Sequence, residues 1–319
     1  MRRRARRVPG PWEVRVREYL EHRRRLGFRL RSCGEELLLF GRHLDSTGFK
    51  GPLTTVVAVR WAQLARRARP QYAAWRLIAL RGFAKYLAAT DPRHEVPPAG
   101  LLGRPYGRSQ PHIYSPAEIA ALLDAALSVK PVQGLPPHTY RAFFGLLAAT
   151  GLRCGEALGL RRDDVDLALG RLTIREGKPG RARVVPLHKS VVRALAAYAE
   201  RRDRFFFWGP KSDAFFLSRR ATALSYHCMT TIFRQLRRQL GWCGRPLPRV
   251  HDLRHTFAVR NLVRWSEMGD DVDKKILALT TYLGHVNVTS TYWYFSAVPE
   301  LMAITGRRFG AFAQGDGAE

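Results

Sequence analysis

The stretch RLTIREGKPGRARVVPL, residues 171 to 187, is the clearest β-hairpin signal in the chain. Polar and apolar residues alternate along both halves, as expected for strands with one buried face. Gly177, Pro179 and Gly180 interrupt the alternation in the middle, where a hairpin needs its turn. Because the segments around it carry helical periodicity, the sequence predicts a mainly α fold with a small β-hairpin or sheet, an α+β arrangement.

The segments on both sides of this hairpin have apolar residues at spacings of three to four, which is typical of helices. They are YSPAEIAALLDAAL (114–127), YRAFFGLLAAT (140–150), SYHCMTTIFRQLRRQLG (225–241) and HDLRHTFAVRNLVRW (251–265). In the first segment Ser115 can cap, Pro116 takes the first helical position and Glu118 closes a capping box. The second is expected to end at Gly151.

Four more helical segments precede residue 90, with basic residues beside the apolar ones. They are WEVRVREYLEHRRRLG (12–27), SCGEELLLFGRHL (32–44), TTVVAVRWAQLARRA (54–68) and QYAAWRLIALRGFAKYLAA (71–89). Prolines and glycines then crowd the chain from Asp91 to His112, a composition that cannot sustain a helix. We therefore expect a basic arm at 1–10, a helical DNA-binding domain at 11–90, a linker at 91–112 and a second domain at 113–319.

The chain carries 54 lysine and arginine residues against 26 aspartate and glutamate residues, a formal net charge of +28. Such an excess opposes compact folding by self-repulsion, so it indicates a polyanionic partner. Nucleic acid is the first partner to expect and an anionic membrane surface the second, although codon usage in a GC-rich genome would also raise the arginine content. Basic residues are spread through both halves of the chain, which favours a protein that wraps double-stranded DNA.

Targeting and redox signals are absent from the sequence. Cys33, Cys154, Cys228 and Cys243 form no CxxC pair, so neither a zinc site nor a disulfide framework is expected. Residues 1–10 are basic but no apolar run follows them, as it would in a signal peptide. No stretch approaches the roughly 18 apolar residues of a membrane span. We expect a cytoplasmic, nucleoid-associated protein.

Two motifs each hold an arginine in a defined setting. In ATGLRCGEALGL, residues 149–160, Arg153 lies between a helix end and another helical turn, and Glu156 is placed to orient it. Such a pair is also typical of a structural ion pair. In HDLRHTFA, His251 and Arg254 are three residues apart and share a helix face. A guanidinium suits a phosphodiester and an imidazole exchanges a proton near neutral pH, while His255 is interpreted as a supporting residue.

Two further features carry potential chemistry. Lys178 lies at the tip of the hairpin, where a lysine is either solvated surface or part of an arm that reaches over DNA. The stretch LGHVNVTSTYWYF, residues 283–295, holds His285, Tyr292 and Tyr294 and no acidic residue. Its tyrosines are either buried rings or include a nucleophile.

Together these motifs make the second domain resemble the tyrosine recombinase, or phage integrase, family. TGLRCGE resembles the family's first arginine box, GKPGRARVVPL its hairpin with a catalytic lysine, and HDLRHTFA its second arginine box. LGHVNVTSTYWY resembles the final box, in which the nucleophilic tyrosine follows the histidine of Leu-Gly-His at the spacing that separates His285 and Tyr294. Residues 12–90 are more loosely similar to the family's helical, SAM-like core-binding domain.

The resemblance implies a set of catalytic residues with one supporting carboxylate. They are Arg153, Lys178, His251, Arg254, His285 and Tyr294, with Glu156 in support. Since residues two apart on a helix point about 200° away from each other, Tyr294 faces the site and Tyr292 packs elsewhere. Two departures from the family are Pro179, where glycine is common, and a long acidic stretch from Trp265 to Thr280.

The same resemblance implies site-specific recombination, integration or transposition of DNA through a 3′-phosphotyrosyl intermediate, without a metal, another cofactor or ATP. No phosphate-binding GxxxxGK[ST] loop occurs in the sequence. A homotetramer on two DNA sites is implied, in which the segment after Tyr294 docks on a neighbour or packs on its own domain. TYWYFSAVPELM, residues 291–302, is also similar to transposon-encoded members that act beside companion recombinases.

Base reading is expected from a helix in the second domain and from the amino-terminal helices. Arg234, Arg237 and Arg238 cluster in TTIFRQLRRQLG, residues 230–241, and suit the major groove, although a solvated helix face would have the same composition.

Three other functions compete with recombination. A type IB topoisomerase would relax DNA without a recognition site, and a DNA-binding regulator with a vestigial site would not need Tyr294. A two-metal nuclease would need inward carboxylates, for which RRDDVDL (161–167) and GDDVDKK (269–275) are the candidates. Both stretches are typical of polar loops or helix starts.

Overall fold

The computed structural model of the protein describes residues 8–28, 30–64, 70–103, 110–175 and 182–284. The chain divides into two compact units, Met1–Arg108 and Ser109–Glu319. Among the described residues, no helix combines the length and the apolar composition that a membrane span requires.

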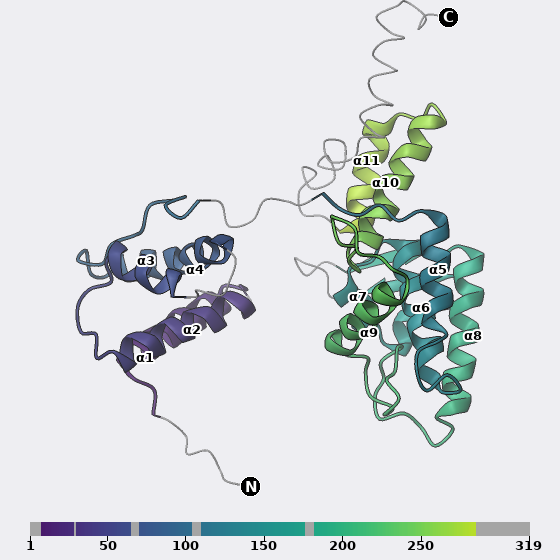
Figure 1. Cartoon of the computed structure of the whole chain (residues 1–319), viewed down its shortest axis with the longest axis horizontal. Helices are drawn as coiled ribbons and strands as arrows, with labels where there is room; N and C mark the ends of the chain where they lie inside the picture. Colours follow the sequence, from purple (N-terminus) through teal and green to yellow (C-terminus); the bar gives the residue numbers. More distant parts are fainter. Residues whose placement is uncertain (1–7, 29, 65–69, 104–109, 176–181, 285–319) are drawn as a thin grey trace, which may run out of the picture. The chain divides into compact units, whose positions relative to one another are not determined.

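The described part of the first unit contains four helices, drawn in purple and blue in Figure 1. They are α1 (Pro11–Arg25), α2 (Arg31–Ser46), α3 (Thr55–Gln63) and α4 (Pro70–Ala88). Helix α1 packs along α2, and α3 packs on α4. Trp12, Phe40 and Phe83 are buried at the centre, because the apolar stripes of these helices face one another. The four expected helical segments are therefore confirmed.

Residues just after α4 fold back onto this unit. The backbone N–H of Leu53 donates to Nδ1 of His94 at 2.8 Å, and the N–H of Glu95 donates to the carbonyl of Leu53 at 2.8 Å. Arg81 also donates to the carbonyl of Pro97 at 2.7 Å. The amino-terminal part of the expected linker thus contributes to the packing of the helical unit.

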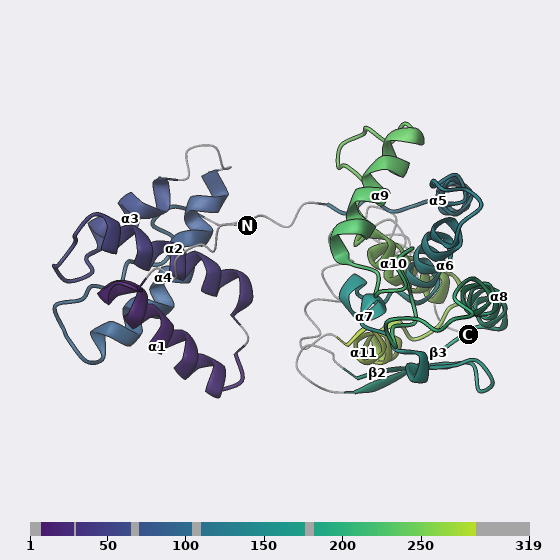
Figure 2. The ribbon, with the colours of Figure 1, turned by 90° about the horizontal axis from the view of Figure 1, so that it is seen from below.

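The second unit is built around a long buried helix, α6. Its helices are α5 (Pro116–Ala126), α6 (Leu135–Thr150), α7 (Cys154–Leu158), α8 (Lys189–Phe205), α9 (Tyr226–Gln239), α10 (Asp252–Glu267) and α11 (Val272–Leu283), with a 3-10 turn η1 (Arg162–Asp164). Helix α6 contacts α5, α7, α8 and α10, and α11 packs on α10 (Figures 1 and 2). The predicted capping box is present, since Ser115 accepts from the N–H of Glu118 and Glu118 accepts from the N–H of Ser115.

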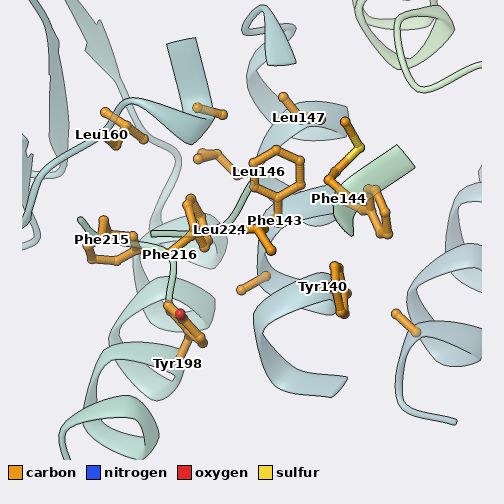
Figure 3. Packing of buried hydrophobic residues seen from close by; sticks show 14 of the residues in the cluster. Tyr140, Phe143, Phe144, Leu146, Leu147, Leu160, Tyr198, Phe215, Phe216 and Leu224 are labelled. Atoms are coloured by element: carbon orange, nitrogen blue, oxygen red, sulfur yellow. The ribbon is translucent and has the colours of Figure 1, made fainter. Parts of the chain in front are cut away.

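Aromatic rings from four segments interlock in the core of this unit, and Figure 3 labels those of α6, Tyr198 and Phe216. Phe143 of α6 meets Phe216 edge to face at 5.2 Å between ring centroids, and Phe144 meets Phe233 of α9 at 5.8 Å. Tyr198 of α8 stacks on Phe216 at 5.5 Å. Edge-to-face and offset pairs of this kind add about 0.5–1.5 kcal/mol each to the burial of their apolar area. They fix α6, α8 and α9 as one rigid scaffold.

Within the residues that the structure describes, the sheet has three antiparallel strands in the order β1-β2-β3. They are β1 (Val165–Asp166), β2 (Arg171–Ile174) and β3 (Arg183–Pro186). Strands β2 and β3 form the predicted hairpin, with Leu172 opposite Val185 and Ile174 opposite Arg183. The mainly α fold with a small sheet is confirmed, and the short strand β1 lies in RRDDVDL, which had been expected to form a loop or helix start.

Candidate active site

Arg153 is held at the junction between α6 and α7. Helix α6 ends at Gly151 with φ +61°, a left-handed conformation that glycine adopts without strain. A Cβ at Gly151 would also lie 2.6 Å from the ring of Phe257, so this corner accepts only glycine. The chain turns here and places Arg153 directly before α7, as its N-cap residue.

Glu156 is the buried anion of the site, with its side chain 4% exposed. It accepts from the backbone N–H and Nη1 of Arg153 at 3.0 and 2.8 Å. It also accepts a bidentate pair from Nη1 and Nη2 of Arg183 at 3.1 and 2.8 Å. Burial alone would raise the pKa of Glu156, but the hydrogen bonds from Arg183 and Arg153 outweigh it and lower the pKa below the ordinary value. The carboxylate is therefore ionised and orients both guanidinium groups.

Arg254 lies in the first turn of α10 and is only 2% exposed. Its Nη1 donates to the carbonyl of Gly151 at 2.8 Å and its Nη2 to the carbonyl of Leu283 at 2.7 Å. The start of α10 is fixed by buried Asp252, whose carboxylate accepts from the backbone and the guanidinium of Arg249. Arg254 thus ties the end of α6 to the end of α11.

Three arginines from three different elements converge on the end of α11. Arg183 Nε donates to the carbonyl of Tyr282 at 2.9 Å, Arg254 to that of Leu283, and Arg153 Nη2 to that of Gly284 at 2.6 Å. The last carbonyls of a helix have no partner within the helix and lie at the negative end of its dipole. Guanidinium groups satisfy both needs, so the arginines cap α11 at the residue that precedes His285.

This cluster carries excess positive charge. Its members in the described part of the chain are Arg153, Arg183 and Arg254 against the single carboxylate of Glu156, a formal charge of +2. A site of this kind favours an anion with several acceptor oxygens, such as a phosphodiester. Arg153 keeps 27% of its side chain exposed, so one of the predicted arginines is accessible from solvent.

His251 directly precedes α10 and has helical backbone angles, so it shares a face with Arg254 as predicted. The residue is exposed, yet desolvation by the surrounding chain lowers the pKa of His251 and the nearby Arg254 guanidinium lowers it further. The lowered pKa favours the neutral imidazole, which is the form that can accept a proton. Its edge meets the ring of His255 at 4.7 Å between centroids, which fits a supporting position for His255.

Three predicted site residues, Lys178, His285 and Tyr294, lie outside the described residues. The described structure brings together Arg153, Glu156, His251 and Arg254, which come from segments that are about a hundred residues apart.

Sequence reasoning missed Arg183 and Tyr282, which also belong to this cluster. Arg183 lies in the stretch predicted to form the hairpin, where the sequence suggested no role for it. The sequence feature that could have identified Arg183 is its position as the first, inward-facing residue of the second strand, after the glycine-rich stretch. Tyr282 stacks on Phe257, and burial raises the pKa of its phenol to about 12 despite the two nearby arginines. A phenol held neutral in this way is a poor nucleophile.

The predicted base-reading arginines on α9 do not share one environment. Met229, Phe233 and Leu236 bury the opposite side of this helix, so Arg234 and Arg238 are exposed. Arg237 is partly buried and donates to the carbonyl of Pro248 at 3.3 Å. That contact ties α9 to the loop before α10, which favours a structural role for Arg237.

The acidic stretches considered for a metal site are occupied by cationic partners. Asp164 pairs with Arg175, and Asp166 with Arg171 at 3.2 Å. Asp270 pairs with Lys275, while Asp271 caps α11 by accepting from the N–H of Lys274. Over the residues that the structure describes, no three His, Cys, Asp or Glu side chains gather as metal ligands. The second stretch is the helix start that the sequence suggested.

The chain is similar to known integrases over most of its length. Residues 114–300 match the phage integrase family. A Sinorhizobium fredii protein named integrase/recombinase y4rB is 42% identical over 300 residues, 92% of this chain and 95% of that protein. Tyrosine recombinase XerD of Mycobacterium tuberculosis is 34% identical over 224 residues, 70% of this chain and 68% of XerD.

Among solved structures, the Tn1549 transposon integrase in complex with transposon right end DNA has a similar fold. The TM-score is 0.67 at 16% identity, and the match covers 94% of this chain and 99% of that one. From the matched residues and the identity to these relatives, the chain belongs to the phage integrase family, whose tyrosine recombinases are DNA strand-transferring enzymes.

Proposed function

We propose that the protein is a site-specific recombinase that cuts and rejoins double-stranded DNA through a 3′-phosphotyrosyl intermediate on Tyr294. The observation that carries this proposal is the convergence of Arg153 and Arg254 on adjacent carbonyls at the end of α11. The chain continues from that point into the segment with His285 and Tyr294. The arginine pair therefore lies at the residue from which the chain runs into the proposed nucleophile's segment.

The two arginines bind the non-bridging oxygens of the scissile phosphate. Charge on these oxygens rises as the pentacoordinate transition state forms, so preorganised guanidinium donors stabilise the transition state more than the ground state. Arg153 is anchored to Glu156 and to the carbonyl of Gly284, and Arg254 to the carbonyls of Gly151 and Leu283, which limits their reorganisation during the reaction. Removal of one such donor typically costs about 10²–10³ in rate.

Proton transfers complete the reaction. The phenol of Tyr294, whose ordinary pKa is about 10, attacks phosphorus as neutral His251 accepts its proton. The bond from phosphorus to the 5′ oxygen breaks, Lys178 protonates that oxygen, and His285 donates to a phosphate oxygen. A 5′ hydroxyl of another strand then reverses these steps and releases Tyr294. The phosphotyrosyl bond conserves the energy of the phosphodiester, so rejoining needs neither ATP nor a metal ion.

The DNA partner is engaged by both units, and four copies act on two sites. The net charge of +28 supports a polyanionic partner in a cytoplasmic, nucleoid-associated setting. Lambda integrase, whose fold is similar, has been solved as a tetramer bound to a Holliday junction. The tetramer is tested by the mass of the complex on DNA that carries the half-site selected in the experiment below. A complex that never exceeds two protomers would reject it.

Covalent capture tests the nucleophile. The probe is a library of nicked duplex half-sites with a randomised arm, from which a short strand is lost after cleavage so that the adduct is trapped. Adducts are isolated on a denaturing gel and sequenced, which yields a selected half-site for later measurements. Tyr294→Phe should abolish the adduct, while Tyr292→Phe and Tyr282→Phe, the matched controls, should retain it.

The same assay separates the competing functions. Full adduct formation in excess chelator is expected, and its loss there would reject the metal-free mechanism. Relaxation of a plasmid that lacks the selected site would favour a topoisomerase. Unchanged adduct formation by Tyr294→Phe would show that the proposed nucleophile is wrong.

A further inference from the structure

Arg183 makes more contacts to the site than a strand residue of a surface hairpin requires. Its side chain is 13% exposed and donates to both carboxylate oxygens of Glu156 and to the carbonyl of Tyr282. The other strand arginine, Arg171, is 49% exposed and pairs with Asp166 on the neighbouring strand. The two arginines lie on one sheet, and only Arg183 is aimed at the arginine cluster.

The packing around Arg183 leaves it little freedom. Gly284 has φ +66°, and a Cβ there would lie 2.9 Å from Nη1 and 3.1 Å from Cζ of Arg183. The guanidinium therefore occupies the volume that a side chain at Gly284 would fill. This close approach fixes the plane of Arg183 against the last turn of α11.

Glu156 links Arg183 to Arg153. Each of the two carboxylate oxygens receives one N–H from Arg183, and one of them also receives Nη1 of Arg153. Arg153 gives each oxygen one hydrogen bond, from Nη1 and from its backbone N–H, and the bidentate pair from Arg183 adds a second to each, which holds the plane of the carboxylate more tightly. The orientation of Arg153 thus depends on Arg183, although Arg183 needs no contact with DNA.

We infer that Arg183 is a positioning residue, which fixes Glu156 and the end of α11 so that Arg153 is held in place for the scissile phosphate. The inference rests on the proposed function. It assigns to the hairpin a second role besides the presentation of Lys178, because Arg183 of strand β3 holds Glu156 and the end of α11 in place.

The test measures the rate of adduct formation at saturating protein on the selected half-site, and the DNA affinity separately. Arg183→Met should lower the rate by about 10- to 100-fold, because displacements of about 1 Å in a positioned group cost up to 10²-fold. DNA affinity should stay within about twofold, since the side chain binds no phosphate. The matched control Arg171→Met should keep both quantities within about twofold.

Arg183→Lys covers the case in which the methionine variant does not fold. It keeps the charge but cannot donate to both oxygens of Glu156 and to Tyr282 at once, so the rate should again fall at least about tenfold. Thermal unfolding of each variant establishes that the measured protein is folded. A lysine variant with a rate close to that of the wild type would overturn the inference.

A double-mutant cycle tests the route through Glu156. If Arg183 acts through this carboxylate, the double variant Glu156→Gln with Arg183→Met should be no slower than Glu156→Gln alone. Rate losses that multiply would contradict the route. Failure of the wild type itself to form any adduct would instead reject the proposed function, so the two failures are distinguishable.

A half-site with sulfur in place of the bridging 5′ oxygen separates Arg183 from Lys178. A thiolate leaves without protonation, so this substrate should restore the rate of Lys178→Ala. The defect of Arg183→Met should persist on it. Full rescue of Arg183→Met would show that Arg183 acts on the hairpin lysine, and the inference would be wrong.

Discussion

Two groups of arginines in the second unit illustrate opposite uses of the same side chain. Arg153, Arg183 and Arg254 converge on the end of α11 from separate elements and have their donors assigned to a carboxylate and to carbonyls. Arg234 and Arg238 are one turn apart on the exposed face of α9. The first group has a geometry set by other elements, whereas the second is exposed, and the hydrogen bond of Arg234 to the carbonyl of Thr230 at 3.3 Å stays within α9 itself.

The difference lies in what substitution would remove. A guanidinium buried at the end of a helix satisfies acceptors that have no alternative partner, so its loss costs both structure and chemistry. An exposed guanidinium contributes mainly charge, which is screened by salt and replaced easily by water. The two groups should therefore respond very differently to the same replacement.

The largest contrast is expected between Arg254→Gln and Arg238→Gln. The first removes a buried donor to Gly151 and Leu283, and adduct formation should fall by about 100-fold or more. The second should leave the rate at saturating protein within about twofold. Single-turnover rates on the selected half-site check both variants. A rate loss below tenfold for Arg254→Gln would contradict the expected difference between the buried and the exposed arginines.

The next largest effect is expected on the stability of the folded protein when the buried arginine cluster loses its carboxylate. Glu156→Gln breaks a buried ion pair and should lower the free energy of unfolding by about 3–5 kcal/mol. The folded-state pKa of Glu156 is lowered, so its contribution is present above the unfolded pKa of about 4.5 and is lost as the pH falls through the folded value. Urea unfolding from pH 7 to pH 3 should show the two proteins converging at low pH.

For this comparison Asp166→Asn, in the exposed pair with Arg171, is the control. It should cost less than about 1 kcal/mol, because exposed ion pairs contribute little. Equal losses for the two carboxylates would mean that burial does not distinguish the clusters.

A smaller effect is expected from Gly284→Ala. The left-handed backbone and the contact with Arg183 should together cost about 1–3 kcal/mol. Gly155→Ala is the matched control, since its Cβ would meet no heavy atom within 4 Å and alanine is favoured in a helix. Thermal unfolding of the two variants should therefore shift in opposite directions, and a neutral Gly284→Ala would argue against tight packing at the end of α11.

The smallest effect is expected on α9. Arg234→Ala and Arg238→Ala should each reduce the slope of log affinity against log salt by about one, if each side chain neutralises one phosphate. Arg237→Ala should leave this slope unchanged, because its guanidinium is engaged with Pro248. Anisotropy titrations of a labelled duplex at several salt concentrations measure the slopes. A reduced slope for Arg237→Ala alone would show that Arg237, and not Arg234 and Arg238, lies on the side of α9 that contacts DNA.

The main elements could be predicted because their signals are local. The capping box at Ser115 and Glu118 and the alternation around the turn of the hairpin each depend on residues within one segment. Strand β1 was missed because two residues carry no periodicity, and it exists only because Val165 lies opposite Leu172. The split of the α9 arginines was missed for a similar reason, since Arg237 is distinguished by a contact to a different segment.

Order and spacing along the chain were enough to indicate a mainly helical fold with one hairpin and an arginine, histidine and tyrosine chemistry, because the motifs are short and contiguous. The partners of those side chains were not readable in this way. Arg153 meets Gly284 across 131 residues, and Arg183 meets Tyr282 across 99. These contacts form because packing of the core brings the unpaired carbonyls at the end of a helix next to buried guanidinium groups. Which residues come together in this way depends on the tertiary structure, and no local sequence pattern encodes it.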